Sequence, residues 1–368
     1  MEIRLMDETL KPVAVVDVFT SFIWTDRFYE CGDFELKLPV ECHPEKMAIG
    51  AYLTYDKSEH VMIIENLQID RSTDDGNIVT VSGRSLESLL DRRAIYEYTY
   101  FKSDSKKGLE DYIELLLKNA IISPSKSYRK ISNFVFEKSG SKDISSLAIE
   151  AQHQGCSLYD AVCGLCQNAG IGWKVTVKDG KFVFRLYSGT DHTSSQKTNR
   201  AVVFSEKMDT LSEVQYLEST ADFRNAALIV GGEDSDAGKV CTDINSNEDD
   251  AKATGLNRRE IVVESAARRK TTNDQGASIT LSESEYRTVL QNAGLDELAR
   301  HRVTKTANGK VDNVSEQFKY GTDFVLGDLV TIDAGLADST TARVVETTFS
   351  EDITGFEMYN SFETVDLN

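Results

Sequence analysis

The chain has 368 residues, a formal net charge of −19 at pH 7 and a hydrophobic content of 40%. This length fits about two to four domains, and 16 Phe and 14 Tyr supply apolar surface for folded cores, which excludes a disordered chain. Nucleic-acid binding draws its affinity from Lys and Arg, so the acidic excess predicts no stable nucleic-acid binding.

The N-terminus lacks the apolar run of a signal peptide, because Met1–Arg4 is soon followed by Asp7, Glu8 and Lys11. No apolar stretch approaches the length of a membrane span, so we expect no membrane span. The six cysteines form no dense framework in a chain of this length. Reduced thiols made in a cytoplasm are therefore expected.

The first hundred residues are predicted to form mostly strands, because apolar residues alternate or run at strand length between turn clusters. The turn clusters are Gly32–Asp33 and Asp74–Gly76, and a short helix is expected near Ser85–Leu90. The predicted strands are Val13–Val18, Phe34–Leu38, Tyr52–Tyr55, Met62–Ile69 and Ile78–Val81.

The middle of the chain has helical periodicity. Apolar residues from Leu109 to Ala120 predict a helix that ends before Pro124, and a second helix is expected over Ser157–Asn168, ending at Gly170. Two strands, Gly172–Val177 and Phe182–Tyr187, follow it. This region reads as a small α+β insertion.

Strand character returns in the second half of the chain, at Ser212–Glu218, Ala226–Val230 and Arg259–Val263. Ser282 and Glu285 form a capping box for a helix. Gly294 is predicted to interrupt this helix, which resumes over Leu295–Val303, and strands are expected from Val311 onward.

The two ends of the chain share a pattern of strand starts, apolar runs and turns, which predicts an internal repeat. A Glu residue, Glu65 or Glu346, follows the apolar run in each copy. The matching segments are Ile49–Thr54, Val61–Glu65 and Asp74–Gly76 in the first copy, and Leu326–Thr331, Ala342–Glu346 and Asp352–Gly355 in the second.

The predicted fold class is mainly β with an α+β insertion. It comprises two tube-like β-barrel domains related by the internal repeat, plus smaller α+β domains. The predicted domains are a first tube-like β-barrel at 1–100, an α+β insertion at 101–200, linking strands at 201–265, and a helix with the second tube-like β-barrel at 266–368.

Four residues have the spacing of zinc ligands: His153, Cys156, Cys163 and Cys166. Cys163 and Cys166 also have the spacing of a redox pair. Both cysteines lie within the predicted helix, however, where Cys is a small core residue. We therefore favour a packing role and predict no metal and no cofactor.

An acidic loop has the start of a calcium-binding pattern in Asp243, Asn245, Asn247, Asp249 and Asp250. Glu248 replaces the Gly that such a loop needs, and no bidentate Glu ends it, so a solvated loop is favoured.

No catalytic site is predicted. The chain has no Gly-x-Ser-x-Gly or His-Glu-x-x-His motif, and His192 follows a strand without an evident nucleophile. Gly231–Gly232 lacks the Lys of a phosphate loop. Trp24 and Trp173 are either core anchors or interface residues, and the sequence leaves both open.

Several blocks in order along the chain resemble the siphophage tail-hub family. The blocks are Ser21–Tyr29 with Gly32–Pro39, Gly83–Leu86 with Leu89–Leu90 and Arg92–Arg93, Val202–Ser205 with Tyr216 and Asn225–Gly232, Gly255–Glu260 and Tyr320–Asp328. The resemblance implies a baseplate or tail-tip hub protein, similar to the hubs of contractile tails and to the spike-base proteins of type VI secretion.

Such hubs are homotrimers that cap the hexameric tail tube, because two copies of a barrel in each chain give a pseudo-six-fold ring. The implied partners are the tail tube protein, distal tail or baseplate proteins, the tape-measure protein and a tail-tip or spike protein. The implied location is the virion tail tip, after assembly in the bacterial host cytoplasm. The alternatives are a receptor-binding module for cell-wall carbohydrate and, with no motif behind it, a cell-wall hydrolase.

Overall fold

The computed structural model describes residues 2–72, 76–234, 238–245, 253–311, 317–333 and 340–365. The predicted mainly β character is confirmed. The chain folds into two compact units, each built from separate segments. Unit 1 comprises Met1–Ser88, Gly172–Leu217 and Lys305–Asn368, and unit 2 comprises Leu89–Ile171 and Glu218–Thr304. The predicted four-domain division follows the chain without interleaving, and its boundaries remain predictions.

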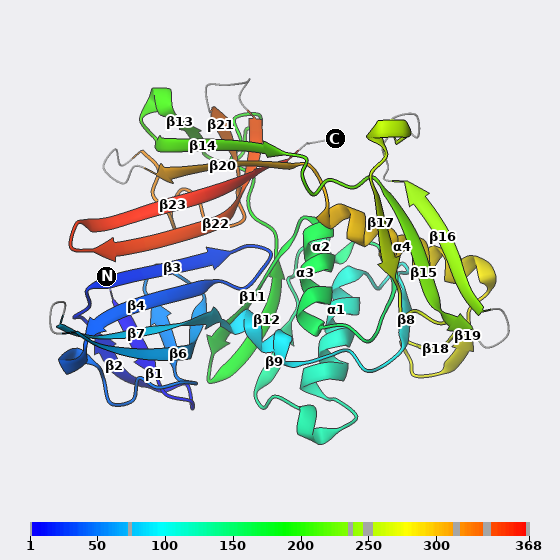
Figure 1. Cartoon of the computed structure of the whole chain (residues 1–368), viewed down its shortest axis with the longest axis horizontal. Coiled ribbons are helices and arrows are strands. Elements are labelled where there is room, and N and C mark those ends of the chain that lie inside the picture. The colour runs from blue at the N-terminus through cyan, green and yellow to red at the C-terminus, as the bar shows by residue number, and fades with distance from the viewer. Residues whose placement is uncertain are drawn as a thin grey trace. The chain divides into compact units, whose positions relative to one another are not determined.

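Unit 1 is built on one large sheet with the strand order β14-β20-β23-β22-β3-β4-β7-β6-β5-β1-β2, while β21 pairs with β22 and β13 pairs with β21 (Figure 1). The described strands form no closed barrel, so the two predicted barrels are not confirmed. The strands are β1 Ile3–Met6, β2 Pro12–Val16, β3 Ser21–Arg27, β4 Asp33–Pro39, β5 Tyr52–Tyr55, β6 Val61–Ser72, β7 Gly76–Ser85, β13 Val203–Ser205, β14 Leu211–Ser219, β20 Thr304–Val311, β21 Leu329–Asp333, β22 Thr340–Asp352 and β23 Gly355–Thr364.

Two sets of five strands in this sheet follow the same path. We call β3, β4, β7, β6 and β5 the N-terminal module, and β14, β20, β23, β22 and β21 the C-terminal module. In each module the five strands neighbour one another in the order just given. Along the chain the order is β3, β4, β5, β6, β7 in the first module and β14, β20, β21, β22, β23 in the second, so corresponding strands follow in the same sequence. The connection between β3 and β4 is short, whereas the chain between β14 and β20 contributes to unit 2.

The registers of the two modules agree around a β-bulge. In the N-terminal module Ile64 pairs with Gly83 and Asn66 with Ser82, which leaves Glu65 as the extra residue. In the C-terminal module Val344 pairs with Phe362 and Glu346 with Ser361, which leaves Val345 as the extra residue. Bulges bend a strand and end one pairing. At this point β6 stops pairing with β5, and β22 stops pairing with β21.

The turn before each module's central hairpin also matches. The Gly50 amide donates to the Ile64 carbonyl at 2.8 Å, and the Gly327 amide donates to the Val344 carbonyl at 2.8 Å. Both glycines have a left-handed backbone, with φ of 91° and 95°, which only Gly adopts at little cost. The same turn therefore sets the register of both modules.

Two details of the predicted repeat differ from the structure. Glu65 and Glu346 are not equivalent, because the bulge aligns Glu65 with Val345. The turn predicted at Asp74–Gly76 lies largely outside the described residues, whereas Asp352 pairs with Gly355 as predicted. Beyond the modules, β1 pairs with β5 antiparallel but β13 pairs with β21 in parallel.

Unit 1 also contains a hairpin of β11 (Gly172–Lys178) and β12 (Lys181–Tyr187). The sequence predicted these two strands, but as part of the α+β insertion. One hydrophobic core runs through the unit and includes Trp24 and Phe349. Among the described residues, no helix is long and apolar enough to cross a membrane.

Unit 2 combines helices with two small sheets, ordered β10-β8-β18-β19 and β16-β15-β17. Its helices are α1 Leu109–Leu117, α2 Lys142–Ser145, α3 Leu158–Ala169 and α4 Glu283–Arg300. Its strands are β8 Thr99–Lys102, β9 Phe134–Glu137, β10 Glu150–His153, β15 Ala226–Asp234, β16 Gly238–Asn245, β17 Glu260–Glu264, β18 Lys270–Asn273 and β19 Ser278–Thr280. A 3-10 helix, Leu86–Arg92, stands where a short helix was predicted.

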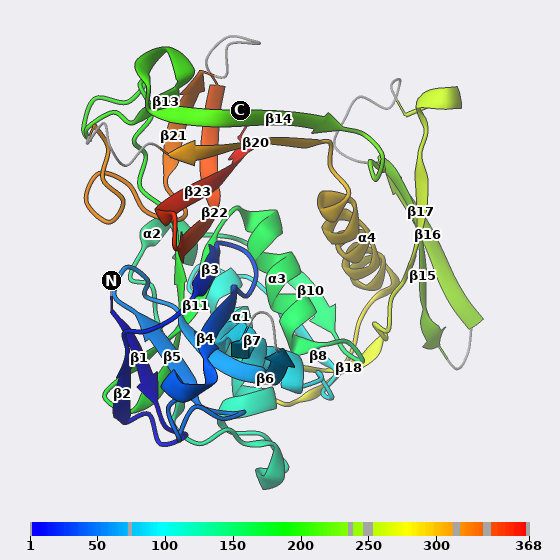
Figure 2. The ribbon, with the colours of Figure 1, turned by 60° about the vertical axis from the view of Figure 1, so that its left-hand side comes forward.

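Helix α4 packs against the β16-β15-β17 sheet (Figure 2). Its predicted capping box is confirmed, since Ser282 Oγ accepts from the Glu285 amide and Glu285 Oε2 accepts from the Ser282 amide. The predicted interruption at Gly294 is wrong, because α4 is continuous through it. Gly294 is instead a packing residue: a Cβ there would lie 2.6 Å from Ile229 Cδ1.

Candidate assembly interface

The two modules are joined edge to edge by β3 and β22. These strands pair antiparallel from Ser21 opposite Asp352 to Arg27 opposite Glu346. Beyond the bulge, β22 no longer pairs with β21 and pairs with β3 instead. We call this pairing the joint; it connects residues more than 300 positions apart in the sequence, as with the Arg27–Glu346 hydrogen bond at a separation of 319.

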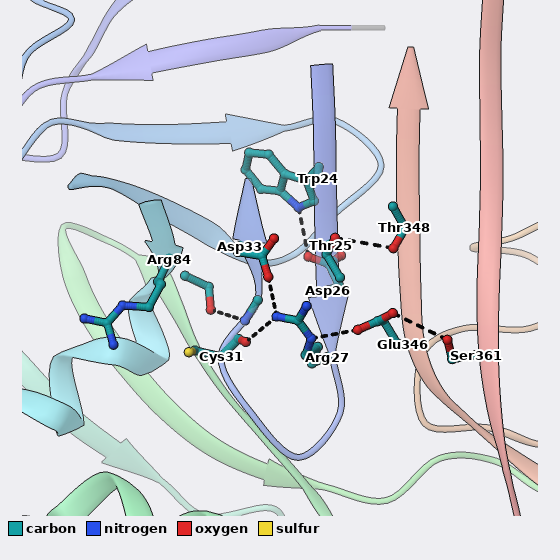
Figure 3. Close-up of polar contacts among 12 residues, drawn as sticks. Trp24, Thr25, Asp26, Arg27, Cys31, Asp33, Arg84, Glu346, Thr348 and Ser361 are labelled. Atoms are coloured by element: carbon teal, nitrogen blue, oxygen red, sulfur yellow. Dashed lines mark hydrogen bonds and ion pairs between the residues drawn. The ribbon is translucent and has the colours of Figure 1, made fainter. Parts of the chain in front are cut away.

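Arg27 is the main polar contact of the joint (Figure 3). Its Nε donates to Glu346 Oε2 at 2.7 Å, and its NH1 group bonds to Asp33 and to the Cys31 carbonyl. Burial opposes the charge of Arg27, but Asp33 and Glu346 raise the pKa of its guanidinium. All three side chains are partly exposed, so the ion pairs add specificity more than stability.

Apolar side chains fill the inner face of the joint. Phe349 pairs with Trp24 across the two strands, and both are fully buried. The Phe349 ring also lies edge-on to Tyr55 of the N-terminal module, with centroids 5.4 Å apart. Full burial of an aromatic side chain of this size contributes about 2 to 3 kcal/mol, so the joint is held mainly by apolar packing and backbone pairing.

A buried charge cluster lies beside the joint strand β3. Trp24 Nε1 donates to Asp26 Oδ1 at 2.8 Å, and His60 Nδ1 lies 3.1 Å from Glu87 Oε1. The Val175 amide, from β11, also donates to Glu87 Oε1. Burial disfavours a charged imidazole, but the carboxylates of Asp26 and Glu87 raise the pKa of His60 to about 9.

The residues with zinc-like spacing lie in β10, in the loop before α3 and in α3. His153 Nδ1 lies 2.8 Å from the Tyr112 hydroxyl, and burial lowers the pKa of His153 to about 4. Cys166 is buried, which raises the pKa of its thiol, and Cys163 lies inside α3, not at its start. Among the described residues, no three His, Cys, Asp or Glu side chains are grouped as a metal site.

The other candidates of the sequence are scattered. Asp243 and Asn245 lie in β16, while Asn247, Asp249 and Asp250 lie outside the described residues. His192 Nδ1 lies 2.9 Å from the Arg200 carbonyl. Gly231–Gly232 continue strand β15.

The two tryptophans are both core residues of unit 1. Trp24 and Trp173 are fully buried, and Trp173 Nε1 donates to the Tyr29 carbonyl at 2.7 Å. Of the two readings left open by the sequence, the core reading holds within the chain.

Sequence reasoning missed the joint. A usable signal was present, because β22 is 13 residues long although its neighbour β21 has only five. A strand that outruns its neighbour needs a second partner or remains an edge. Which strand supplies the partner for β22 could not be read from the pattern.

The fold is that of phage tail proteins. The tail protein from Neisseria meningitidis MC58 superposes with a TM-score of 0.57 at 12% identity, over 99% of this chain and 96% of that one. The 43 kDa tail protein of prophage MuSo2 from Shewanella oneidensis gives 0.53 at 15% identity, over 99% and 98%. A component of the E. coli type VI secretion system gives 0.45 at 10% identity, over 95% and 74%. No curated protein matches the sequence.

The family model described as Siphovirus ReqiPepy6 Gp37-like protein matches residues 2–358. The chain therefore belongs to this siphovirus tail protein family. The resemblance to a phage tail family predicted from the ordered sequence blocks is confirmed at this level.

Proposed function

We propose that this protein is a structural hub at the tail tip, a homotrimer whose six modules form a pseudo-six-fold ring that caps the tail tube. The observation that carries the proposal is the pair of modules with one strand path, one bulge and one turn. A single module per chain could not match three chains to a six-fold tube, whereas two near-equivalent modules can.

In this proposal the protein acts through its shape and through the pairing of its strand edges with other proteins, without catalysis. In it, one side of the ring contacts the tail tube protein, with the tape-measure protein in the channel, and the other side contacts distal tail, tail-tip or spike proteins. The virion tail tip is the proposed location, after assembly in the host cytoplasm. The family and the fold support this placement.

Charge suggests a property of the proposed channel. A trimer carries three times −19, or −57. Acidic residues along the channel would repel DNA as it passes and so prevent adsorption. A cryo-microscopy map of the ring tests this directly, and a basic channel lining would contradict it.

The test of the function is the mass in solution together with negative-stain images. Three chains of 41.0 kDa give about 123 kDa, and a ring with six lobes is expected. Adding purified tail tubes should place the ring at one tube end. Binding to isolated cell walls without binding to tubes would favour the receptor-binding alternative, and clearing on a zymogram would favour a hydrolase.

A further inference from the structure

The modules leave two strand edges that correspond to the two halves of the joint. Since β22 corresponds to β6 and β3 corresponds to β14, the counterpart of the joint is β6 beyond its bulge, Asn66–Arg71, facing β14. Among the described residues, Asn66–Arg71 have β7 as their one neighbour, and β14 ends the strand order of the sheet.

Side chains in the joint are buried, whereas their counterparts on the two open edges are exposed, as expected for strands that lack a neighbour. Thr347 and Phe349 of β22 are fully buried, whereas Ile69, the counterpart of Phe349, is 50% exposed. Phe22 and Trp24 of β3 are fully buried. In β14, by contrast, almost every residue from Ser212 to Glu218 is exposed.

Each edge presents apolar side chains on the core side of its sheet. Leu67 packs partly against the core, and Ile69 follows it on the same face. On β14, Val214 packs partly against the core, and Tyr216, which is 39% exposed, follows it on the same face. An open strand edge with apolar side chains is a template for another strand.

Charged residues keep both edges soluble before they pair. Asp70 and Arg71 are exposed on β6, and Glu213 and Glu218 are exposed on β14. Glu213 also has a positive φ of 54°, an irregularity that discourages pairing with an arbitrary strand. The edges are therefore suited to one specific partner.

We propose that β14 of one copy pairs antiparallel with Asn66–Arg71 of the next copy and so repeats the joint between chains. This inference rests on the proposed trimer and names its interface. The contact is head-to-tail, since the two edges differ, and such contacts form a ring when the rotation closes. Around the ring, the joint within each chain would then alternate with the equivalent contact between neighbouring chains.

The test places a charge on each edge. Ile69→Lys and Tyr216→Lys alter exposed side chains, so each variant should fold. Its melting temperature should equal that of the wild type at a concentration low enough for the wild type to be monomeric. Each should shift the mass from about 123 kDa to the 41.0 kDa of one chain. Matched controls are Ile353→Lys in the β22–β23 turn and Tyr128→Lys in unit 2, whose side chains are 99% and 77% exposed; both should remain trimeric.

Mixing the two edge variants tests whether the contact between chains is head-to-tail. The Ile69→Lys chain keeps an intact β14, and the Tyr216→Lys chain keeps an intact Asn66–Arg71 edge. One intact contact should form between them and give a dimer of twice 41.0 kDa, or 82 kDa. A mixture that returns the trimer contradicts the head-to-tail contact.

The outcomes separate this inference from the function on which it rests. A wild-type trimer that survives both edge substitutions overturns the proposed interface and leaves the trimeric hub in place. A wild-type chain that stays at 41.0 kDa, alone and on tail tubes, overturns both.

Discussion

The N-terminal and C-terminal modules share a backbone path but differ in what covers their long strand. β22 is covered by β3 and its inner side chains are buried, whereas β6 beyond the bulge is open and Ile69 is half exposed. The two modules share the turn and the bulge, whereas the strands beside β22 and β6 differ. Equivalent positions should therefore respond differently to the same substitution.

The largest difference is expected at Phe349 and Ile69. Phe349→Ala should cost about 3 to 5 kcal/mol of unfolding free energy, because it empties a fully buried site in the joint. Ile69→Ala should cost under about 1 kcal/mol, because the side chain is half exposed. Urea unfolding of both in the Tyr216→Lys background, where we expect a monomer, measures the difference. Equal costs would show that β6 is already covered within the monomer.

The two turn glycines differ in their surroundings. Gly50→Ala should cost about 1 to 2 kcal/mol for the left-handed backbone alone, since no atom lies within 4 Å of its Cβ position. Gly327→Ala has the same backbone cost and also meets Phe28 Cε2 at 2.4 Å, which adds about 1 to 3 kcal/mol of overpacking. Thermal unfolding should give a lower Tm for Gly327→Ala than for Gly50→Ala. The double variant Gly327→Ala with Phe28→Leu should recover part of the stability that Gly327→Ala loses.

The buried charge cluster lies beside the N-terminal module, and the counterpart of its His60 in the C-terminal module is the uncharged Thr340. The pKa of His60 is raised to about 9, so its stabilisation is complete below about pH 6.5 and is lost as the pH rises through about 9. The loss is up to about 3 kcal/mol. Unfolding of wild type and His60→Gln from pH 6 to pH 9.5 tests this, and a wild-type curve parallel to that of the variant would contradict it.

The smallest effect is expected at the ion pair of the joint. Arg27 and Glu346 are about one-third exposed, at 31% and 32%, so a double-mutant cycle with Arg27→Met and Glu346→Gln should give a coupling energy under about 1 kcal/mol. The coupling should fall further in 0.5 M NaCl. A coupling above about 2 kcal/mol would assign the joint to electrostatics and not to packing.

Local features of the fold could be predicted from the sequence. Gly50 and Gly327 marked the matching turns, Asp352–Gly355 marked a hairpin, and Ser282 with Glu285 marked the start of α4, because each depends on residues close in the chain. Gly294 misled the prediction, since its small size serves contact with Ile229 and does not weaken the helix.

Long-range features could not be predicted. The equivalence of Glu65 with Glu346 failed by one residue, because a bulge shifts the register without a distinct sequence signal. The pairing of β3 with β22 joins two strands whose patterns fit many partners. Interleaving of the units has the same cause, since composition does not show where a chain returns to an earlier sheet.

The wide separation of β3 and β22 in the chain has a consequence during synthesis. Ribosomes add about 5 to 20 residues per second, so the roughly 300 residues between the strands take about 15 to 60 s to make. Throughout that interval a nascent chain holds β3 as an unoccupied edge, and chains released early lack the strand that fills it. The joint can therefore close only after β22 has been made, so the synthesis of β22 sets the earliest time at which β3 gains its second neighbour.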